Sequence, residues 1–292
     1  MLENDLPLMR GENVVEKNPD QTQFTTRYTE AALEFIERQR EKPFFLYLAQ
    51  HMPHVPLFVS DKFAGKSPRG LYGDVVMELD WSVGQIFEKL KRLSLDERTL
   101  VIFMSDNGPW LHYGIDGGSA GPLRDGKVAT WEGGVRVPAI ARWPGRIPAG
   151  RRSDAIAGNL DLLPTLAKLG GAKVPGERVI DGRDLWPLLS GKTEESPHQY
   201  FHYLAGSPEK QINYRGIRDA KWKLVITVGT EGKVEARELY DLDSDPSERF
   251  DRLKQHPHIG ERLAAAAQEF YTALRANMRP AGKRAAGNTN QR

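Results

Sequence analysis

The sequence predicts an α/β fold in which a mostly parallel sheet flanked by helices precedes a small antiparallel-sheet subdomain with a terminal helix. Two apolar runs of strand length, residues 44–49 (FFLYLA) and 99–104 (TLVIFM), predict the larger sheet. A strongly periodic helical segment at residues 72–93 separates them, which is the order of a right-handed crossover unit between parallel strands. Short strand-like segments after residue 191 predict the antiparallel subdomain.

The composition of the 292 residues is that of a globular protein with many loops, with 39% hydrophobic and 27% charged residues. A net charge of +2 gives no reason to expect nucleic acid or an anionic membrane as a partner. Because the sequence holds no cysteine, disulfides, zinc–thiolate sites and a cysteine nucleophile are excluded within it. No apolar run approaches the roughly 18–20 residues of a membrane helix, and residues 1–20 contain no secretory signal.

The first elements follow from hydrophobic periodicity. After a short extended piece at residues 13–15, a helix is predicted over residues 26–40, with Ala32 and Ile36 on one face. A Lys-Pro dipeptide ends this helix. We interpret the two apolar runs that follow in the chain as strands buried on both faces, as in a parallel sheet.

The later elements begin with a Gly-rich loop at residues 108–134, which is too long to be a simple connector. A strand at residues 137–142 and a helix at residues 161–169, followed by Gly-Gly, are predicted next. The subdomain elements are three antiparallel strands and one amphipathic helix: residues 215–218, 222–228, 238–242 and 259–276. The predicted organisation is a catalytic α/β domain part at 1–190, the subdomain at 191–279, and a disordered tail at 280–292.

Each of the two apolar runs ends in a polar cluster. The first is followed by His51 and His54 in the segment HMPHVP, and the second by Asp106 and Asn107 in the segment SDNGP. In open α/β sheets, ligands bind outside the carboxyl ends of the strands. We therefore expect both clusters to lie on one rim of the sheet and to face one site.

Asp106 and Asn107 offer a carboxylate and an amide oxygen, which are ligands that Ca²⁺ or Mg²⁺ takes. Two ligands are too few for such an ion, and Asn-Gly and Gly-Pro also form ordinary turns. His54, between two prolines, is a candidate general acid or anion donor, or else a loop histidine bonded to backbone carbonyls. Lys127 in the Gly-rich loop is a candidate for neutralising a sulfate or phosphate oxygen, or else a solvated surface lysine. We interpret Arg136 as a structural ion-pair partner.

A set of segments, in this order, resembles the sulfatase family of the alkaline-phosphatase superfamily, and most closely the arylsulfatase A-like group. The segments are RYTEAALEFIE, PFFLYLAQHMPHVPL, LYGDVVMELDWSVGQI, TLVIFMSDNGP, GPLRDGKVATWEGGVRVPAIARWPG, LDLLPTLAKLGG, DGRDLWPLLSG and ELYDLDSDPSE. A lone SDNG is a weak signal, whereas DNGP followed by LRxGK and EGGVRVP is highly specific. The final segment departs from the family, because ERFDRL replaces the usual ExxNL ending.

The resemblance implies roles for four residues. Asp106 and Asn107 match the late pair of ligands for the family's active-site calcium. His54 matches the histidine that contacts the sulfate group and protonates the leaving oxygen, and Lys127 matches the lysine that binds the sulfate. His112, on the loop after DNGP, matches no invariant role and is a candidate substrate contact.

The resemblance also implies what the sequence does not contain. The family's nucleophile is a formylglycine made from the Cys or Ser of a C/S-x-P-x-R motif, and neither form of the motif occurs here. The early Asp-Asp metal pair of the family is missing as well. We therefore expect a carboxy-terminal part of a sulfatase, inactive alone, whose complete form hydrolyses aryl or carbohydrate sulfates in the periplasm or outside the cell.

Two alternatives remain open. One is a phosphodiesterase or phosphonate hydrolase of the same superfamily, because sulfate and phosphate sites share geometry. The other is a non-catalytic remnant that uses the fold for binding or assembly and has no affinity for metal.

Overall fold

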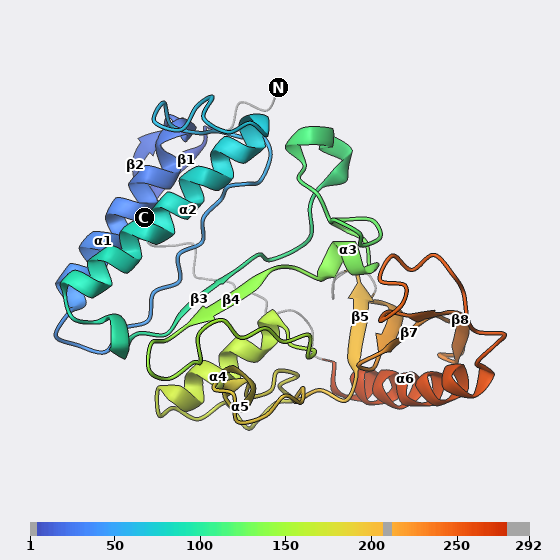
Figure 1. Cartoon of the computed structure of the whole chain (residues 1–292). Helices are drawn as coiled ribbons and strands as arrows, with labels where there is room; N and C mark the ends of the chain where they lie inside the picture. The colour runs from blue at the N-terminus through green and yellow to red at the C-terminus, as the bar shows by residue number, and fades with distance from the viewer. Residues whose placement is uncertain (1–4, 207–211, 279–292) are drawn as a thin grey trace, which may run out of the picture. The chain divides into compact units, whose positions relative to one another are not determined.

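The computed structural model describes residues 5–206 and 212–278, which fall into two compact units (Figure 1). The first unit comprises Met1–Val101, Trp110–Gly118 and Arg142–Arg146. The second comprises Ile102–Pro109, Ser119–Ala141 and Ile147–Arg292. Within the described residues, no helix is both long enough and apolar enough to span a bilayer.

The first unit is built on two helices that lie side by side, α1 (Phe24–Gln39) and α2 (Gly70–Arg92) (Figure 1). The buried residues of α1 recur at spacings of three and four, which turns one stripe of the helix toward α2: Thr25, Thr29, Ala32 and Ile36. Both helices were predicted to within two residues at each end. An antiparallel hairpin, β1 (Pro7–Arg10) and β2 (Asn13–Lys17), precedes them, and the sequence predicted only its second strand.

The apolar run at residues 44–49 is not a strand, and its prediction as a strand buried on both faces was wrong. Its side chains alternate, because Phe44 and Leu46 pack against the cluster around Ile36, whereas Phe45 is 71% exposed and Tyr47 is 79% exposed. Among the described residues, no strand pairs with this segment. Apolar composition predicts burial, but a strand also needs a neighbour that accepts its backbone hydrogen bonds.

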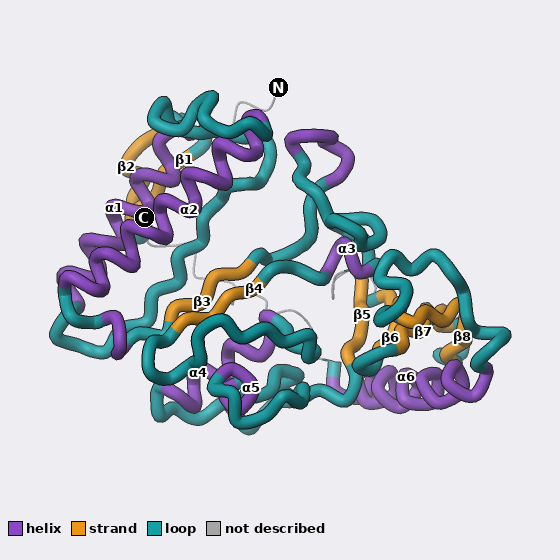
Figure 2. Tube along the Cα trace, in the orientation of Figure 1, coloured by secondary structure: helices purple, strands orange, loops and turns teal. Residues whose placement is uncertain are grey.

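The second unit contains most of a two-stranded sheet, β3 (Val101–Met104) and β4 (Ala139–Arg142) (Figure 2). Both strands were predicted, and both are two residues shorter at the start than expected. Burial on both faces is not observed, since Phe103 is 42% exposed and Ile140 is 63% exposed. Short helices and turns follow in the chain: α3 (Glu132–Val135), η4 (Asn159–Asp161), α4 (Leu162–Leu169) and α5 (Trp186–Leu189).

The antiparallel subdomain is confirmed, with one strand more than predicted. Its four strands pair in chain order: β5 (Phe201–Ala205), β6 (Asn213–Arg218), β7 (Trp222–Val228) and β8 (Val234–Asp241). Helix α6 (Pro257–Asn277) lies along one face of the sheet (Figure 1). Leu263 and Ala267, one turn apart on α6, are fully buried against Ile217, Leu224 and Leu239. The predicted tail at residues 280–292 lies outside the described residues.

Candidate functional site

The SDNGP segment forms a turn at the end of β3 that is fixed to α3. The Gly108 N–H donates to the Gly134 carbonyl over 3.0 Å, and the Ser105 hydroxyl donates to the Asn107 carbonyl over 2.9 Å. A Cβ atom at Gly108 would lie 1.9 Å from the carbonyl oxygen of Gly133, so only glycine allows this close approach. The turn leaves the Asp106 side chain exposed and that of Asn107 half-buried.

The loop that carries Lys127 is bonded directly to this turn. The Lys127 N–H donates to the Pro109 carbonyl over 2.8 Å, which brings the backbone of Lys127 next to the segment that holds Asp106 and Asn107. Asp125 and Val128, on either side, adopt left-handed backbone conformations with φ of 60° and 75°. Such a conformation is unfavourable for a β-branched residue such as valine, and it persists only where the surroundings fix the backbone.

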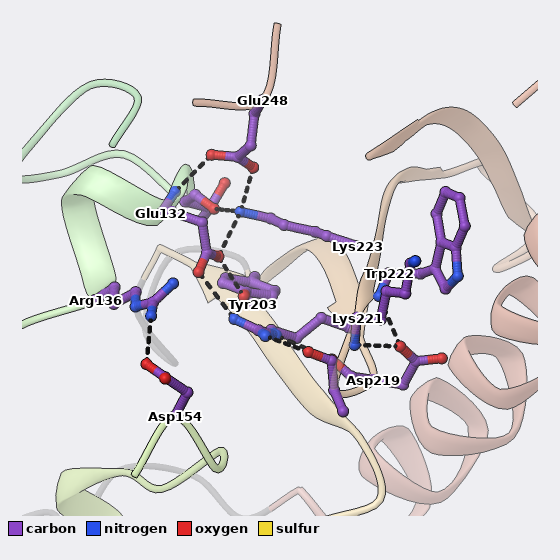
Figure 3. Close-up of polar contacts among 12 residues, drawn as sticks. Glu132, Arg136, Asp154, Tyr203, Asp219, Lys221, Trp222, Lys223 and Glu248 are labelled. Atoms are coloured by element: carbon purple, nitrogen blue, oxygen red, sulfur yellow. Dashed lines mark hydrogen bonds and ion pairs between the residues drawn. The ribbon is translucent and has the colours of Figure 1, made fainter. Parts of the chain in front are cut away.

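A buried ionic cluster joins α3 to the C-terminal sheet (Figure 3). The Glu132 carboxylate accepts hydrogen bonds from the Tyr203 hydroxyl at 2.6 Å, Arg218 at 2.9 Å and Lys223 at 3.2 Å. The Lys223 ammonium also forms an ion pair with Glu248 at 2.7 Å. Glu132, Lys223 and Glu248 are each only 1% exposed, so each charge depends on its partners to offset the cost of leaving water.

The surroundings shift the pKa values of the two carboxylates of this cluster in opposite directions. Burial opposes ionisation of Glu132, but the charges of Lys223 and Arg218 outweigh it, and its pKa lies below the ordinary value. Burial also dominates at Glu248, where the charge of Lys223 does not fully offset it, so the pKa of Glu248 is raised. Burial beside Glu132 raises the pKa of Tyr203 well above its usual range, so its hydroxyl stays a hydrogen-bond donor.

Arg124 holds the start of the same loop. Its guanidinium lies 3.5 Å over the ring of Trp131 and donates to the Glu248 carbonyl over 2.9 Å. The carbonyl of Arg124 accepts the Gly133 N–H at 2.8 Å, which closes the loop on itself. Farther along, Arg136 forms an ion pair with Asp154 at 3.3 Å, in line with its interpretation as a structural residue.

His54 and His112 belong to the first unit, whereas Asp106, Asn107 and Lys127 belong to the second. The His54 side chain is exposed, and its Nδ1 lies 2.7 Å from the Val55 carbonyl oxygen. Because a carbonyl only accepts, Nδ1 carries the hydrogen in this contact.

The first unit also packs aromatic rings around its histidines. The His54 ring meets the edge of Trp110, which directly follows the DNGP turn in the sequence, with 5.6 Å between centroids. His51 packs edge-on against Phe24 at 4.8 Å, and burial lowers the pKa of His51. His51 is therefore a packing residue, and His112 is exposed on the turn at Leu111–Asp116.

The donors for a calcium ion are incomplete among the described residues. Asp106 and Asn107 provide two oxygen-bearing side chains, and residues 5–206 and 212–278 contain no group of three or more His, Cys, Asp or Glu residues placed to hold a metal ion. Calcium takes about 6–8 oxygen ligands. These residues fit a part of such a shell but do not form a closed cage, so no chemical step is assigned to a metal ion here.

Comparison with solved structures identifies the fold class. Ps i-CgsB, both alone and in complex with k-i-k-neocarrahexaose, superposes with a TM-score of 0.79 at 30% identity, over 94% of this chain and 59% of that one. The PsFucS1 sulfatase from Pseudoalteromonas sp. gives a TM-score of 0.78 at 25% identity, over 89% and 55% of the two chains. These relatives confirm the α/β fold predicted from the sequence.

Sequence comparison identifies the family. The Sulfatase family model matches residues 7–172, and a model of the C-terminal part of N-sulphoglucosamine sulphohydrolase matches residues 125–272. Human steryl-sulfatase is 46% identical over 202 residues, which cover 67% of this chain and 35% of that protein. Human arylsulfatase A is 39% identical over 267 residues, which cover 85% and 52%. The chain belongs to the sulfatase family, and it spans between 35% and 52% of the length of these two relatives.

Sequence reasoning missed the ionic cluster. Glu132 and Glu248 lie in segments that resemble the family, but their partner Lys223 lies 91 residues after Glu132, in the apolar strand WKLVITV. The one signal is positional: Leu224 and Ile226 face the core beneath α6, so Lys223 faces the opposite side of the sheet. A lysine in that register is buried only if a second layer supplies oxygens, which α3 and Glu248 do.

Proposed function

We propose that the chain carries the sulfate-binding side of a sulfuric ester hydrolase that acts on aryl or carbohydrate sulfates. The observation that carries the proposal is the hydrogen bond between Lys127 N–H and the Pro109 carbonyl, which brings the loop bearing the lysine beside the DNGP turn. Relatives named steryl-sulfatase and N-acetylgalactosamine-6-sulfatase support a sulfate ester as the substrate. A related protein was solved in complex with k-i-k-neocarrahexaose, which supports a carbohydrate.

Each proposed role uses the chemistry of one side chain. The Lys127 ammonium neutralises a sulfate oxygen as a point charge, and Nε2 of His54 donates a proton to the leaving alcohol oxygen. Asp106 and Asn107 would hold a calcium ion with two oxygens, and the chemistry it would supply is polarisation of the sulfate group. His112 contacts the alcohol part of the ester.

We assign the nucleophile to no residue of this chain, because the printed sequence has no cysteine and no Ser-x-Pro-x-Arg. The 292-residue chain alone is therefore expected to hydrolyse neither 4-nitrophenyl sulfate nor phenyl phosphonate esters. Turnover of the sulfate ester would overturn the proposal of inactivity, and faster turnover of the phosphonate ester would favour a phosphonate hydrolase. A phosphonate monoester hydrolase is among the solved structures with this fold, at 19% identity.

Calorimetry with Ca²⁺ separates the proposal from a non-catalytic binding protein. We expect weak binding, with a dissociation constant on the order of 10⁻⁴–10⁻³ M, because only part of the ligand shell is provided. Asp106→Ala is expected to abolish this binding, and Asp116→Ala, on the turn at Leu111–Asp116, serves as the control. A wild-type chain that binds no calcium would favour the non-catalytic alternative.

A further inference from the structure

We infer that Lys223 is a positioning residue for Lys127, because it fixes the loop at residues 124–134 to the C-terminal sheet. The inference rests on the proposed function insofar as Lys127 binds sulfate. It concerns a side chain that comes from β7 and never reaches the surface.

The ammonium of Lys223 lies close to three oxygens. It donates to the Thr130 carbonyl at 2.8 Å and to Glu132 Oε1 at 3.2 Å, and it forms an ion pair with Glu248 Oε1 at 2.7 Å. Two of its three N–H groups therefore hold the segment that contains Thr130 and Glu132. Thr130 is the residue three positions after Lys127, and the bond to its carbonyl therefore acts on the backbone of the loop itself.

Glu248 extends this attachment to both ends of the loop. Its Oε2 accepts the Glu132 N–H at 2.7 Å (Figure 3). Its backbone carbonyl accepts a hydrogen bond from Arg124 Nη1 at 2.9 Å. Both ends of the loop, at Arg124 and Glu132, are thus bonded to Glu248. Between these two ends, the Lys127 N–H is bonded to the DNGP turn.

Because of the backbone conformation beside Lys127, this attachment affects the position of Lys127 as well as the stability of the fold. Val128 has a φ of 75°, which a free valine avoids, and it lies between Lys127 and the carbonyl of Thr130 that Lys223 holds. If that bond is lost, Val128 is free to return to an ordinary conformation, which changes the direction of the chain at Lys127. A cluster that only stabilised the fold would have no such local effect.

A variant that keeps the cluster electrically balanced can separate an effect on the position of Lys127 from an effect on the stability of the fold. Glu132 and Glu248 carry two negative charges, and Lys223 and Arg218 carry two positive charges, so the cluster is balanced. Lys223→Met alone leaves a buried negative charge unpaired and destabilises the fold as well. The double variant Lys223→Met/Glu248→Gln restores the balance, and the amide oxygen introduced at 248 still accepts the Glu132 N–H. It removes the charged donor to the Thr130 carbonyl.

The test compares this double variant with Lys221→Met/Asp241→Asn, which removes the ion pair between the exposed Lys221 and the half-buried Asp241 of β8. Hydrogen exchange measured by mass spectrometry follows the opening of the loop backbone. Titration with inorganic sulfate measures the affinity of the site that includes Lys127. For Lys223→Met/Glu248→Gln we expect at least tenfold faster exchange over residues 124–134, at least tenfold weaker sulfate binding, and unchanged exchange in α6. The control variant is expected to match the wild type.

Wild-type exchange of the loop in the folded double variant would overturn the inference. If the wild type binds no sulfate while loop exchange still rises, the proposed function fails and the positioning role stands. Should Lys223→Met/Glu248→Gln not fold, Lys223→Gln/Glu248→Gln keeps a donor in the cluster that is too short to reach Thr130, and the same outcomes decide.

Discussion

The C-terminal sheet and the run at residues 44–49 have similar apolar sequences but differ in burial. Both are rich in large apolar residues, but Leu224 and Leu239 are fully buried, whereas Phe45 is 71% exposed and Tyr47 is 79% exposed. The sheet is covered by α6 from the same part of the chain, and the run has no partner strand among the described residues. Apolar residues become a core only where a second layer and a paired backbone are both present.

Asp74 of the first unit and Glu132 of the second are buried with different kinds of partner. In the first unit, the buried carboxylates accept hydrogen bonds from neighbouring backbone and hydroxyl groups, as Asp74 does from the N–H groups of Gly65 and Ser67. In the second, Glu132 is paired with cations 86 and 91 residues away. Backbone donors fix a local turn, whereas ion pairs between distant segments join separate parts of a unit, so their removal is expected to have larger effects.

Lys223→Met is expected to have the largest effect on stability. It leaves Glu132 and Glu248 with one cation between them in a buried site, which costs about 3–5 kcal/mol of unfolding free energy. Urea unfolding followed by circular dichroism measures the change, with the exposed Lys221→Met as control. A loss of less than about 1 kcal/mol would mean that the cluster is reached by water or already neutralised.

Leu239→Ala is expected to follow, with a loss of about 2–5 kcal/mol, because the side chain is fully buried and leaves a cavity beneath α6. The slowest-exchanging amides of β6 and β7 report this loss directly. A value near zero would show that the sheet and α6 do not form one cooperative core.

Acidification is expected to weaken the C-terminal sheet through His202. Burial, with a smaller contribution from His198, lowers the pKa of His202 to about 4, and its ring stacks on Phe270 with 3.6 Å between centroids. Because the folded pKa is depressed, the unfolded chain takes up the proton first, and stability is lost as the pH falls from about 6.5 toward about 4. Between pH 7.5 and pH 5 the loss is about 2 kcal/mol.

The pH dependence is checked by unfolding experiments at both pH values with His202→Gln, which removes the titrating group. The variant should lose most of the difference between the two pH values, whatever its own stability. An equal difference in the variant and the wild type would assign the effect to other groups.

Phe45→Ser is expected to have the smallest effect, within about 0.5 kcal/mol, because 71% of the residue is already exposed. Phe44→Ser is the matched comparison, since Phe44 packs against the cluster around Ile36, and it should be clearly destabilising. Equal losses for both variants would show that Phe45 is covered in solution.

Much of the fold was predictable because its signals are local. The helices α1, α2 and α6 carry long apolar stripes, and all three were predicted to within two residues at each end. Strands β1 and β5 were missed, because short strands become visible only through their hydrogen-bonded partners. The strand predicted at residues 44–49 was wrong for a related reason: apolar composition does not show whether a neighbouring strand is present to pair with it.

The candidate site was predictable in part. Position at the end of an apolar strand singled out Asp106 and Asn107. Position in the Gly-rich loop made Lys127 a candidate, and the family resemblance implied its role. The hydrogen bond that joins Lys127 to the DNGP turn crosses the Gly-rich loop, where no periodicity exists to predict it. Lys223 could not be inferred, because its partners come from segments distant in sequence and meet only in the folded unit.

The central claim is that Lys127 binds sulfate, and titration of the purified chain with inorganic sulfate tests it most directly. Lys127→Met is compared with Lys254→Met, which removes an exposed lysine from the same unit. Both variants therefore have the same net charge. Loss of a charge-assisted contact is expected to weaken binding by about 10- to 100-fold in Lys127→Met alone. Equal affinities of the two variants for sulfate would contradict the account.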